Sequence, residues 1–470
     1  MGKTITTALL FFSLQLVASA QFAYNDACAI AHSKILNLDF EPNSVPTEFQ
    51  SWIEGYMLLT QAITNTNIEQ LQQADYSQLI KNQKQYESDN AYYYLCISDL
   101  QLIKSFVSIS NKSYWQAVSN YLAARQNANK TIGWMQKRFR MFQLVIDAQL
   151  YNNFPIFAEN LTTEQRITKF INLATTIESD SLVPSAFKTE IAILSVLLLP
   201  SLGAGDSTIV QLCQKNMDKC KTSAAATLAF ANTLWHKGQS AEAKKLLTSA
   251  LQNGFFEKAN RFNLLMGCTL QNIQNDSCKI YLNRYIEKQA NGGDVGYAKF
   301  KLAWHFFLQG DTATASPLCA DVKQHRAITP NDAQAKYECS LYQHWDSVLI
   351  VARLHFDAGN YAACEQYLLK NRHKLQNYTN AQLNEYAYRM GRAYHKMGDL
   401  TKAKKFYEVA ANQQLANLLY YPSYAFYYLG EIYKAEGNQP KADFYFQQCK
   451  KTSSPIYKES IHRKAELQMR

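Results

Sequence analysis

Glycine and proline are scarce in this chain, which has 17 glycines and 10 prolines in 470 residues. Many of them stand where a turn is expected, so few remain to interrupt regular structure. Segments in which apolar and polar residues alternate, as half-buried strands require, are also rare. Alanine, leucine, glutamine, lysine and tyrosine recur at helical spacing instead. Because 47% of the residues are apolar, the chain can bury an extensive core, and we expect an all-α fold.

Motifs for catalysis and for metal binding are lacking as well. The sequence contains no H-E-x-x-H, G-x-S-x-G, Walker loop or C-x-x-C, and no G-x-G-x-x-G after a strand. Its nine histidines are scattered, and none pairs with another at one-turn spacing. We therefore expect no catalytic residues, no cofactor and no metal, and the protein is predicted not to be an enzyme. An unrecognised active site in residues 21–220 is left open as an alternative.

Long apolar runs are absent beyond the N-terminus. The apolar stretch 193–203 is interrupted at Pro200, so no transmembrane span is expected. Residues 1–20 have a charged start, a short apolar run over residues 5–17 and an A-x-A site directly before Gln21. This order is typical of a cleaved secretory signal peptide. We predict an exported mature protein that is periplasmic, associated with the cell surface or secreted.

A repeated turn dominates the second half of the chain. Helically spaced residues precede and follow Gly398-Asp399, and a glycine there accepts the left-handed conformation that ends a helix. The same arrangement recurs at glycines 238, 310, 359, 398 and 437, the last three at steps of 39 residues, and Gln274 takes the glycine position after the first. The sequence therefore predicts a series of helical hairpins. The longer step from Gly310 to Gly359 predicts an insertion.

These hairpins resemble tetratricopeptide repeats (TPR), in which a period of about 34 residues combines a small residue in helix A, a Gly-Asp or Gly-Asn turn and a small residue in helix B. The residues that carry the resemblance occupy equivalent positions in two successive hairpins: Gly391, Gly398, Ala403, Tyr407 and Ala410, then Gly430, Gly437, Ala442, Phe446 and Cys449. The resemblance implies that helices A and B meet closely at Gly391 and Ala403. The C-terminal end is also similar to Iml2-like TPR proteins.

The predicted signal peptide and the resemblance together give the chain an expected domain organisation. Residues 1–20 are the signal peptide, and residues 21–221 form an irregular helical region with one TPR-like hairpin near 95–128. Residues 222–452 form the TPR-like α-solenoid, and residues 453–470 form a basic C-terminal helix or tail. Since each hairpin needs its neighbours to cover its apolar face, the array is expected to be stable only as a stack.

A TPR array implies a concave groove lined by the inner faces of its A helices. Transferring that geometry repeat by repeat selects the expected partner-binding residues Trp304, Phe307, Arg353, Tyr388, Arg392, His395, Lys396, Tyr424 and Lys434, with Phe356 and Tyr427 beside them. Arginine and lysine among aromatic rings suit a carboxylate-bearing peptide. Packing of several of these rings against the next repeat is the alternative.

Charge is concentrated at the C-terminal end. The chain has a net charge of +10, and residues 365–470 contain 17 lysines and arginines against 9 acidic residues. This excess favours an acidic partner. Nucleic acid is not expected, because no nucleic-acid module is present and the 30 tyrosines favour packing between helices over a platform for bases.

We predict an exported scaffold or adaptor for a protein or peptide. A carbohydrate-binding or nutrient-uptake accessory protein of the cell envelope is the alternative.

Ten cysteines bear on the compartment, because exported proteins can keep disulfides. Cys268 and Cys278 flank the turn at Gln274, Cys213 and Cys220 are close in sequence, and Cys319 and Cys339 flank the predicted insertion. The sequence does not decide which cysteines pair. Small apolar side chains filling crowded helix contacts are the alternative interpretation.

Overall fold

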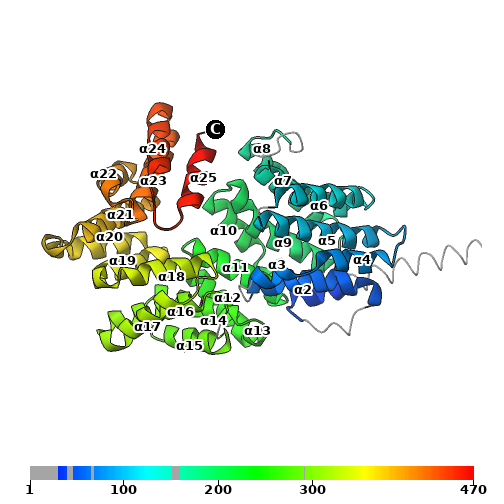
Figure 1. Cartoon of the computed structure of the whole chain (residues 1–470), viewed down its shortest axis with the longest axis horizontal. Helices are drawn as coiled ribbons and strands as arrows, with labels where there is room; N and C mark the ends of the chain where they lie inside the picture. The colour runs from blue at the N-terminus through cyan, green and yellow to red at the C-terminus, as the bar shows by residue number, and fades with distance from the viewer. Residues whose placement is uncertain are drawn as a thin grey trace, which may run out of the picture. The chain divides into compact units, whose positions relative to one another are not determined.

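The protein is described by a computed structural model that covers residues 30–39, 46–64, 68–111, 113–150, 159–289 and 292–469 (Figure 1). Within these residues all regular structure is helical and no strand occurs, which confirms the predicted all-α fold. The predicted signal peptide lies outside the described residues. The chain divides into two compact units. Unit 1 comprises residues 1–233 and 246–262, and unit 2 comprises residues 234–245 and 263–470.

Helices of varied length make up the first half of the chain. Residues 30–36 are helical, and the following elements are η2 (Thr47–Phe49), α2 (Gln50–Thr64), α3 (Ile68–Gln73), α4 (Tyr76–Lys84), α5 (Ala91–Ser110), α6 (Tyr114–Ala128), α7 (Gly133–Leu150), α8 (Thr163–Ser179), α9 (Ser185–Leu198), η4 (Leu199–Leu202), α10 (Asp206–Lys215), η5 (Met217–Lys221), α11 (Ala224–His236), α12 (Ser240–Gln252) and α13 (Phe255–Lys258).

A helical hairpin in unit 1 is formed by α5 and α6, which pack along each other. Ala117, Tyr121 and Ala124 recur on one face of α6 and are completely buried. The hydroxyl of Ser105 on α5 donates a hydrogen bond to the carbonyl oxygen of Ala117 (2.8 Å). Small residues and one ring thus allow the two helices to approach closely.

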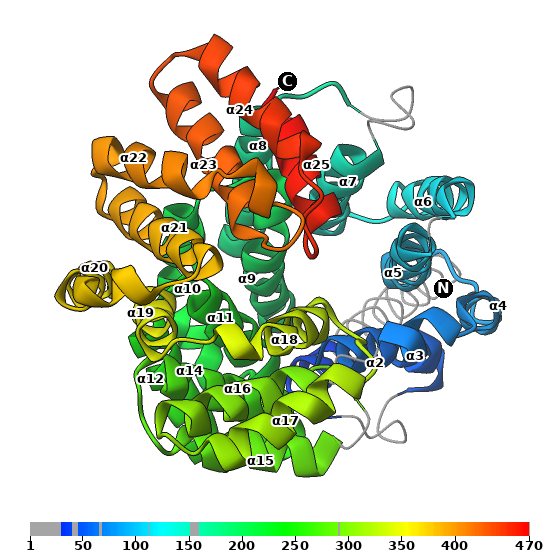
Figure 2. The ribbon, with the colours of Figure 1, turned by 60° about the vertical axis from the view of Figure 1, so that its left-hand side comes forward.

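Successive helical hairpins build the second half of the chain, and they stack as a TPR-like solenoid in unit 2 (Figure 2). The elements are α14 (Arg261–Asn272), α15 (Cys278–Gln289), α16 (Val295–Leu308), α17 (Thr312–Gln324), α18 (Pro330–Ser340), η6 (Tyr342–His344), α19 (Ser347–Asp357), α20 (Tyr361–Lys370), η7 (Arg372–Asn377), α21 (Asn380–Met397), α22 (Leu400–Ala410), η8 (Gln413–Leu415), α23 (Tyr421–Ala435), α24 (Gln439–Lys451) and α25 (Lys458–Gln468).

The predicted turns are present at every expected position. The turn glycines at 238, 310, 359, 398 and 437 all have φ between +72° and +86°. Gln274, which the sequence places in a glycine position, has φ +55°. Positive φ is uncommon for a residue with a side chain. The turns that join the two helices of the six predicted hairpins are therefore confirmed.

The close approach of helices A and B differs in detail from the expectation. Ala403 is completely buried, as predicted, but Gly391 faces an aromatic ring. A Cβ atom on Gly391 would lie 2.7 Å from Cδ1 of Tyr407, and one on Gly430 would lie 2.5 Å from Cε1 of Phe446. Each glycine thus makes room for the ring on helix B of its own hairpin.

Helix α18, with η6, forms the predicted insertion between the α16–α17 and α19–α20 hairpins. Figure 2 shows α18 beside α16 and α17, and it packs on both. Thr329 caps its start, because the Thr329 side chain accepts a hydrogen bond from the Asp332 amide (3.0 Å). Pro330 at the first turn has no amide hydrogen to leave unpaired. The insertion is therefore a docked helix.

Helix α9 together with η4, Ser185–Leu202, is the one stretch among the described residues that is long and apolar enough to cross a membrane, and half of it is buried inside the structure. It carries Glu190, whose carboxylate is paired with Arg138 within unit 1. The nine cysteines among the described residues are all buried. These cysteines occupy the crowded positions that a small apolar side chain can fill.

Candidate protein-binding surface

Helix α21 carries four of the predicted binding residues. Its start is fixed by a capping box, in which the side chains of Thr379 and Gln382 each accept a hydrogen bond from the other residue's amide. Tyr388, Arg392 and His395 follow at spacings of four and three residues. Such positions lie on one face of a helix. The sequence therefore places an aromatic ring, a guanidinium and an imidazole side by side.

Arg392 lies within a cage of aromatic rings. Its guanidinium carbon is 4.4 Å from the ring centre of Phe356, 5.0 Å from Tyr428 and 5.7 Å from Tyr388. The guanidinium donates a hydrogen bond to the hydroxyl of Tyr388 (3.0 Å). Among the described residues, no carboxylate forms an ion pair with Arg392. A guanidinium has five N–H donors, so this arrangement holds the cation in place and leaves donors for an anion.

His395 and Glu431 complete the surroundings of this cage. His395 Nδ1 lies 3.3 Å from the hydroxyl of Tyr407. Burial, assisted by the positive charges of Arg392 and Lys396, lowers the pKa of His395 to about 4, so the imidazole is neutral at neutral pH. Burial raises the pKa of Glu431, and its carboxylate accepts a hydrogen bond from Tyr427 (2.7 Å). The positive charge near the cage therefore comes from the guanidinium and the adjacent lysine.

Tyr424 and Lys434 lie on α23 in different surroundings. Tyr424 is half-buried, and its ring contacts those of Tyr420, Tyr428 and Tyr457 at centre distances of 6.0 to 6.1 Å. Lys434 is exposed and donates to Oε1 of Gln468 on α25 (3.1 Å). Tyr424 thus joins the cage through Tyr428, whereas Lys434 is engaged with the C-terminal helix.

Trp304 and Phe307 form a second group with Trp345, and Arg353 joins it over the ring of Trp304. Trp304 is 2% exposed and Arg353 is 8% exposed. The Arg353 guanidinium carbon lies 4.8 Å from the ring centre of Trp304 and pairs with Glu338 of the inserted helix (2.6 Å). The ring of Phe307 lies 5.5 Å from that of Trp345. Arg353 is thus engaged by Glu338 of α18, whereas Arg392 on α21 packs against the rings of Phe356 and Tyr428.

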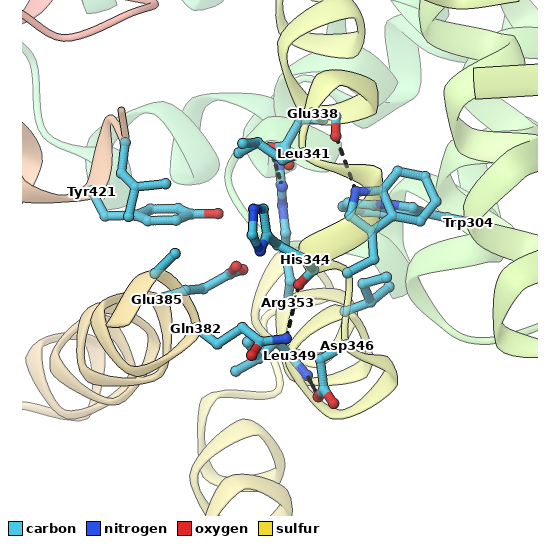
Figure 3. Close-up of a pocket in the computed structure, with 14 residues that line it drawn as sticks. Trp304, Glu338, Leu341, His344, Asp346, Leu349, Arg353, Gln382, Glu385 and Tyr421 are labelled. Carbon is cyan, nitrogen blue, oxygen red and sulfur yellow. Dashed lines mark hydrogen bonds and ion pairs between the residues drawn. The ribbon is translucent and has the colours of Figure 1, made fainter. Parts of the chain in front are cut away.

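A small cavity adjoins this second group (Figure 3). Figure 3 shows Glu338, Arg353, Glu385 and Tyr421 around it, with a hydrogen bond from Gln382 to the carbonyl oxygen of His344 (3.0 Å). The volume is about 30 Å³, which is room for about one or two water molecules. The cavity is therefore part of a tightly packed polar contact between α18, α19, α21 and α23, and a side chain of a partner would not fit.

Three charged residues near these groups were not predicted from the sequence. Glu338 stands on the insertion, which has no counterpart in the repeat pattern. Arg389 is buried, pairs with Glu385 one turn away (2.6 Å) and lies over the ring of Tyr421 (5.3 Å). Lys301 is 1% exposed, and its Nζ lies 4.5 Å from the ring centre of Trp304. For Arg389 and Lys301 the available signal was their position beside Tyr388 on α21 and one turn from Trp304 on α16, whereas Glu338 offered none.

Unit 1 contains a buried charge network centred on Arg138. Its guanidinium pairs with Asp99 (2.7 Å) and with Glu190 (2.6 Å) and also donates to the hydroxyl of Tyr56. The Trp52 indole donates to Asp99 (3.0 Å). Burial raises the pKa of Asp99, while for Glu190 the opposing effect of Arg138 prevails over burial and lowers the pKa. Both carboxylates are at least 94% buried, and the network joins α5, α7 and α9 within unit 1.

No metal site is formed among the residues that the structure describes, since no group of three or more His, Cys, Asp or Glu side chains converges there. A shallow hollow in unit 1 is lined by side chains of α8, which are polar apart from one leucine. It contains no aromatic ring, and stacking of a sugar on an aromatic ring is therefore not available there.

Comparisons with known proteins agree with the repeat pattern. Family models described as tetratricopeptide repeats match residues 385–412 and 424–453, which correspond to the α21–α22 and α23–α24 hairpins. No curated protein matches the sequence.

Solved structures that resemble the chain include the human IFIT1 dimer with m7Gppp-AAAA, at 13% identity and a TM-score of 0.31, covering 81% of this chain and 94% of that one. Yeast Tom70 is similar at 14% identity and a TM-score of 0.24, covering 90% of this chain and 95% of that one. On the strength of the two matched repeats, the C-terminal region of this chain carries tetratricopeptide repeats.

Proposed function

We propose that this protein is an exported scaffold that binds a protein or peptide partner through the inner face of its TPR hairpins, and that an acidic residue of the partner pairs with Arg392. Proteins with such repeats generally serve as protein-binding scaffolds, and the chain lacks the motifs of a catalyst. The export signal expected in residues 1–20 supports a location outside the cytoplasm.

The observation that carries this proposal is the aromatic cage around Arg392. Arg353 and Arg389 are neutralised by Glu338 and Glu385, whereas Arg392 has rings on its faces and no carboxylate pair among the described residues. The rings hold the guanidinium in one orientation, so little conformational entropy is lost when a carboxylate binds it. A charge-assisted contact of this kind is stronger than a neutral hydrogen bond.

The charge around the repeats supports an acidic partner. Lys396 is exposed one helical turn from Arg392. Further exposed cations lie on the later repeats and α25, among them Lys405, Lys451 and Arg463. Cations spread over a surface accelerate the encounter with an acidic partner and make binding sensitive to salt.

The test uses a displayed library of random peptides, selected against the full chain without its first twenty residues. Selected peptides are then titrated against the wild type, against Arg392→Gln with Lys396→Gln, and against the matched control Lys370→Gln with Arg372→Gln, which removes two exposed cations elsewhere. We expect peptides rich in Asp and Glu, at least about tenfold weaker binding for the first variant, and little change for the control.

The same titrations at several salt concentrations separate the contact from general attraction. The slope of affinity against salt should fall in the Arg392 and Lys396 variant, because one charge-assisted contact is missing. Selection of peptides without acidic residues, or equal affinities of the wild type and the first variant with unchanged helical circular dichroism, would overturn the proposal.

A further inference from the structure

Cys319 and Cys339 are brought together by α17 and the inserted helix α18, so Cys339 lies within the insertion and does not flank it as the sequence predicts. Cys319 lies on α17 and Cys339 lies near the end of α18, and the two helices pack on each other. Their sulfur atoms are 2.7 Å apart, which is closer than two unbonded sulfur atoms ordinarily approach. The two side chains are 1% and 0% exposed. Both thiols are free in this structure.

The neighbours of the pair show why the two thiols meet. Ala315 and Val322 on α17, and Ala335 on α18, are buried beside them at one-turn spacing. The small side chains of Ala315 and Ala335 allow a close approach of the two helices at this level. Cys278, by contrast, has its sulfur 3.5 Å from Nδ1 of His305. Cys319 and Cys339 thus have the juxtaposition that a disulfide requires.

We propose that Cys319 and Cys339 form a disulfide when the chain folds in an oxidising compartment, and that this bond fixes the inserted helix α18 on the repeat array. This inference does not depend on the proposed partner, because it concerns a covalent link within unit 2. It needs only an oxidising environment, which the export expected from residues 1–20 would supply.

The bond forms by two thiol–disulfide exchange steps. One thiolate attacks the disulfide of an oxidised dithiol donor, such as an exported oxidoreductase, and a mixed disulfide forms as one donor sulfur leaves. The second thiolate then attacks the sulfur of its partner cysteine in that mixed disulfide and releases the donor as a dithiol. The two cysteines lose two protons and two electrons, and the donor takes up both electrons and two protons.

Burial determines when this reaction can occur. The exchange requires a thiolate, and both side chains are enclosed once α18 has docked. The adjacent Cys319 sulfur and burial both raise the pKa of the Cys339 thiol well above its ordinary range. We therefore infer that the bond forms during folding, before α18 closes over it, and that it is then protected from reductants.

The bond would act on the inner face of the repeats through Glu338, the residue directly before Cys339. Glu338 pairs with Arg353 (2.6 Å), and its carbonyl oxygen accepts a hydrogen bond from the Trp345 indole (3.0 Å). An untethered α18 would have to hold this carboxylate in place through non-covalent contacts alone. The disulfide thus helps to keep the cation of Arg353 neutralised by Glu338.

The test begins with the reduced, unfolded full chain without its first twenty residues. The chain is refolded in a mixture of glutathione and glutathione disulfide, and free thiols are alkylated in denaturant. Mass spectrometry of the digest should show a peptide that links Cys319 to Cys339, lighter than the reduced pair by two hydrogen atoms. Cys364 and Cys449, which are buried on the repeats, serve as internal controls and should be alkylated.

Hydrogen exchange of the same material measures what the bond does. Amides of α18 should exchange about tenfold faster or more in protein refolded with its thiols reduced than in oxidised protein, and those of α23 should not differ. The variant with Cys319→Ala and Cys339→Ala should behave as the reduced protein. Alkylation of both cysteines after oxidative refolding, or a link to any other cysteine, would overturn the inference, whatever the outcome of the peptide-binding test.

Discussion

Gly359 lies against Gly238, with the two backbones in direct contact although the residues stand at the turns of different hairpins. A Cβ atom on Gly359 would overlap the carbonyl oxygen of Gly238, and one on Gly238 would lie 3.3 Å from Cα of Gly359. Nearby, the hydroxyl of Ser240 donates to the carbonyl oxygen of Asp357 (3.4 Å). Glycine is thus needed at both positions for two reasons: the backbone has positive φ, and the two turns approach too closely for a side chain.

This contact predicts different costs for one substitution at two turns. Gly359→Ala adds a left-handed alanine, which costs about 1–2 kcal/mol, and a clash with the neighbouring turn, which costs about 1–3 kcal/mol more. Gly437→Ala should incur only the first cost, because its Cβ would meet nothing within 4 Å. Urea denaturation measures both variants. Equal losses of unfolding free energy would mean that the contact between the turns does not hold in solution.

The turns themselves were predictable from the sequence, while their contact was not. The turn at Gly398 can be predicted because a single residue type, glycine, permits positive φ there without steric cost. Gln274, whose φ is +55°, is predictable from spacing instead, because it stands midway between the turns at Gly238 and Gly310. Which turns touch depends instead on the summed twist of several hairpins and on the inserted helix. No local pattern encodes that sum.

Packing between helices A and B gives a second prediction. Ala403 is completely buried, whereas the adjacent Lys402 side chain is 56% exposed. Ala403→Leu should overpack the hairpin and lower the unfolding free energy by about 1–3 kcal/mol. Lys402→Leu, the matched control, should change it by no more than about 0.5 kcal/mol. Thermal or urea unfolding distinguishes the two, and equal stability of the variants would mean that the helix faces are assigned wrongly.

The buried network of unit 1 gives a third prediction. Arg138→Met removes the only guanidinium shared by Asp99 and Glu190 among the described residues. Two uncompensated carboxylates should then lower stability by about 3–5 kcal/mol. Adding Asp99→Asn and Glu190→Gln removes the charges that were left behind and should restore part of the loss. If Arg138→Met unfolds at the wild-type urea concentration, the network does not stabilise unit 1.

For the candidate binding surface, the sequence predicts only which side chains of one helix lie on the same face. The spacing of Tyr388, Arg392 and His395 places them on one face, and the structure keeps them together. Arg353 was expected on the same groove, but Glu338 reaches it from the insertion. A long-range ion pair of this kind depends on where a helix docks, and the step of 49 residues between turns shows only that something is inserted. The unit 1 network was missed for the same reason, since its charges come from separate helices.

His32 provides a prediction on pH. Its ring is completely buried against Phe187, at a centre distance of 4.2 Å, and its Nε2 lies 3.6 Å from Oε2 of Glu190. Burial lowers its pKa from 6.5 to about 4, with Glu190 raising it and Arg138 lowering it. Protons therefore bind the unfolded chain first as pH falls. The contribution of His32 to the unfolding free energy is fully present above pH 6.5. It is lost as the pH falls from 6.5 to about 4, and it changes no further below that.

The expected loss through His32 is of the order of 3 kcal/mol, from the difference between the two pKa values. His395, whose pKa is also about 4, titrates over the same range, so we would measure unfolding in a His395→Gln background. In that background, His32→Phe should flatten the decline in unfolding free energy between pH 6.5 and 4, because phenylalanine keeps the apolar contacts and binds no proton. Glu190, whose pKa is lowered, contributes only at more acidic pH. An unchanged slope in the His32→Phe variant would show that the imidazole is already solvated in the folded chain.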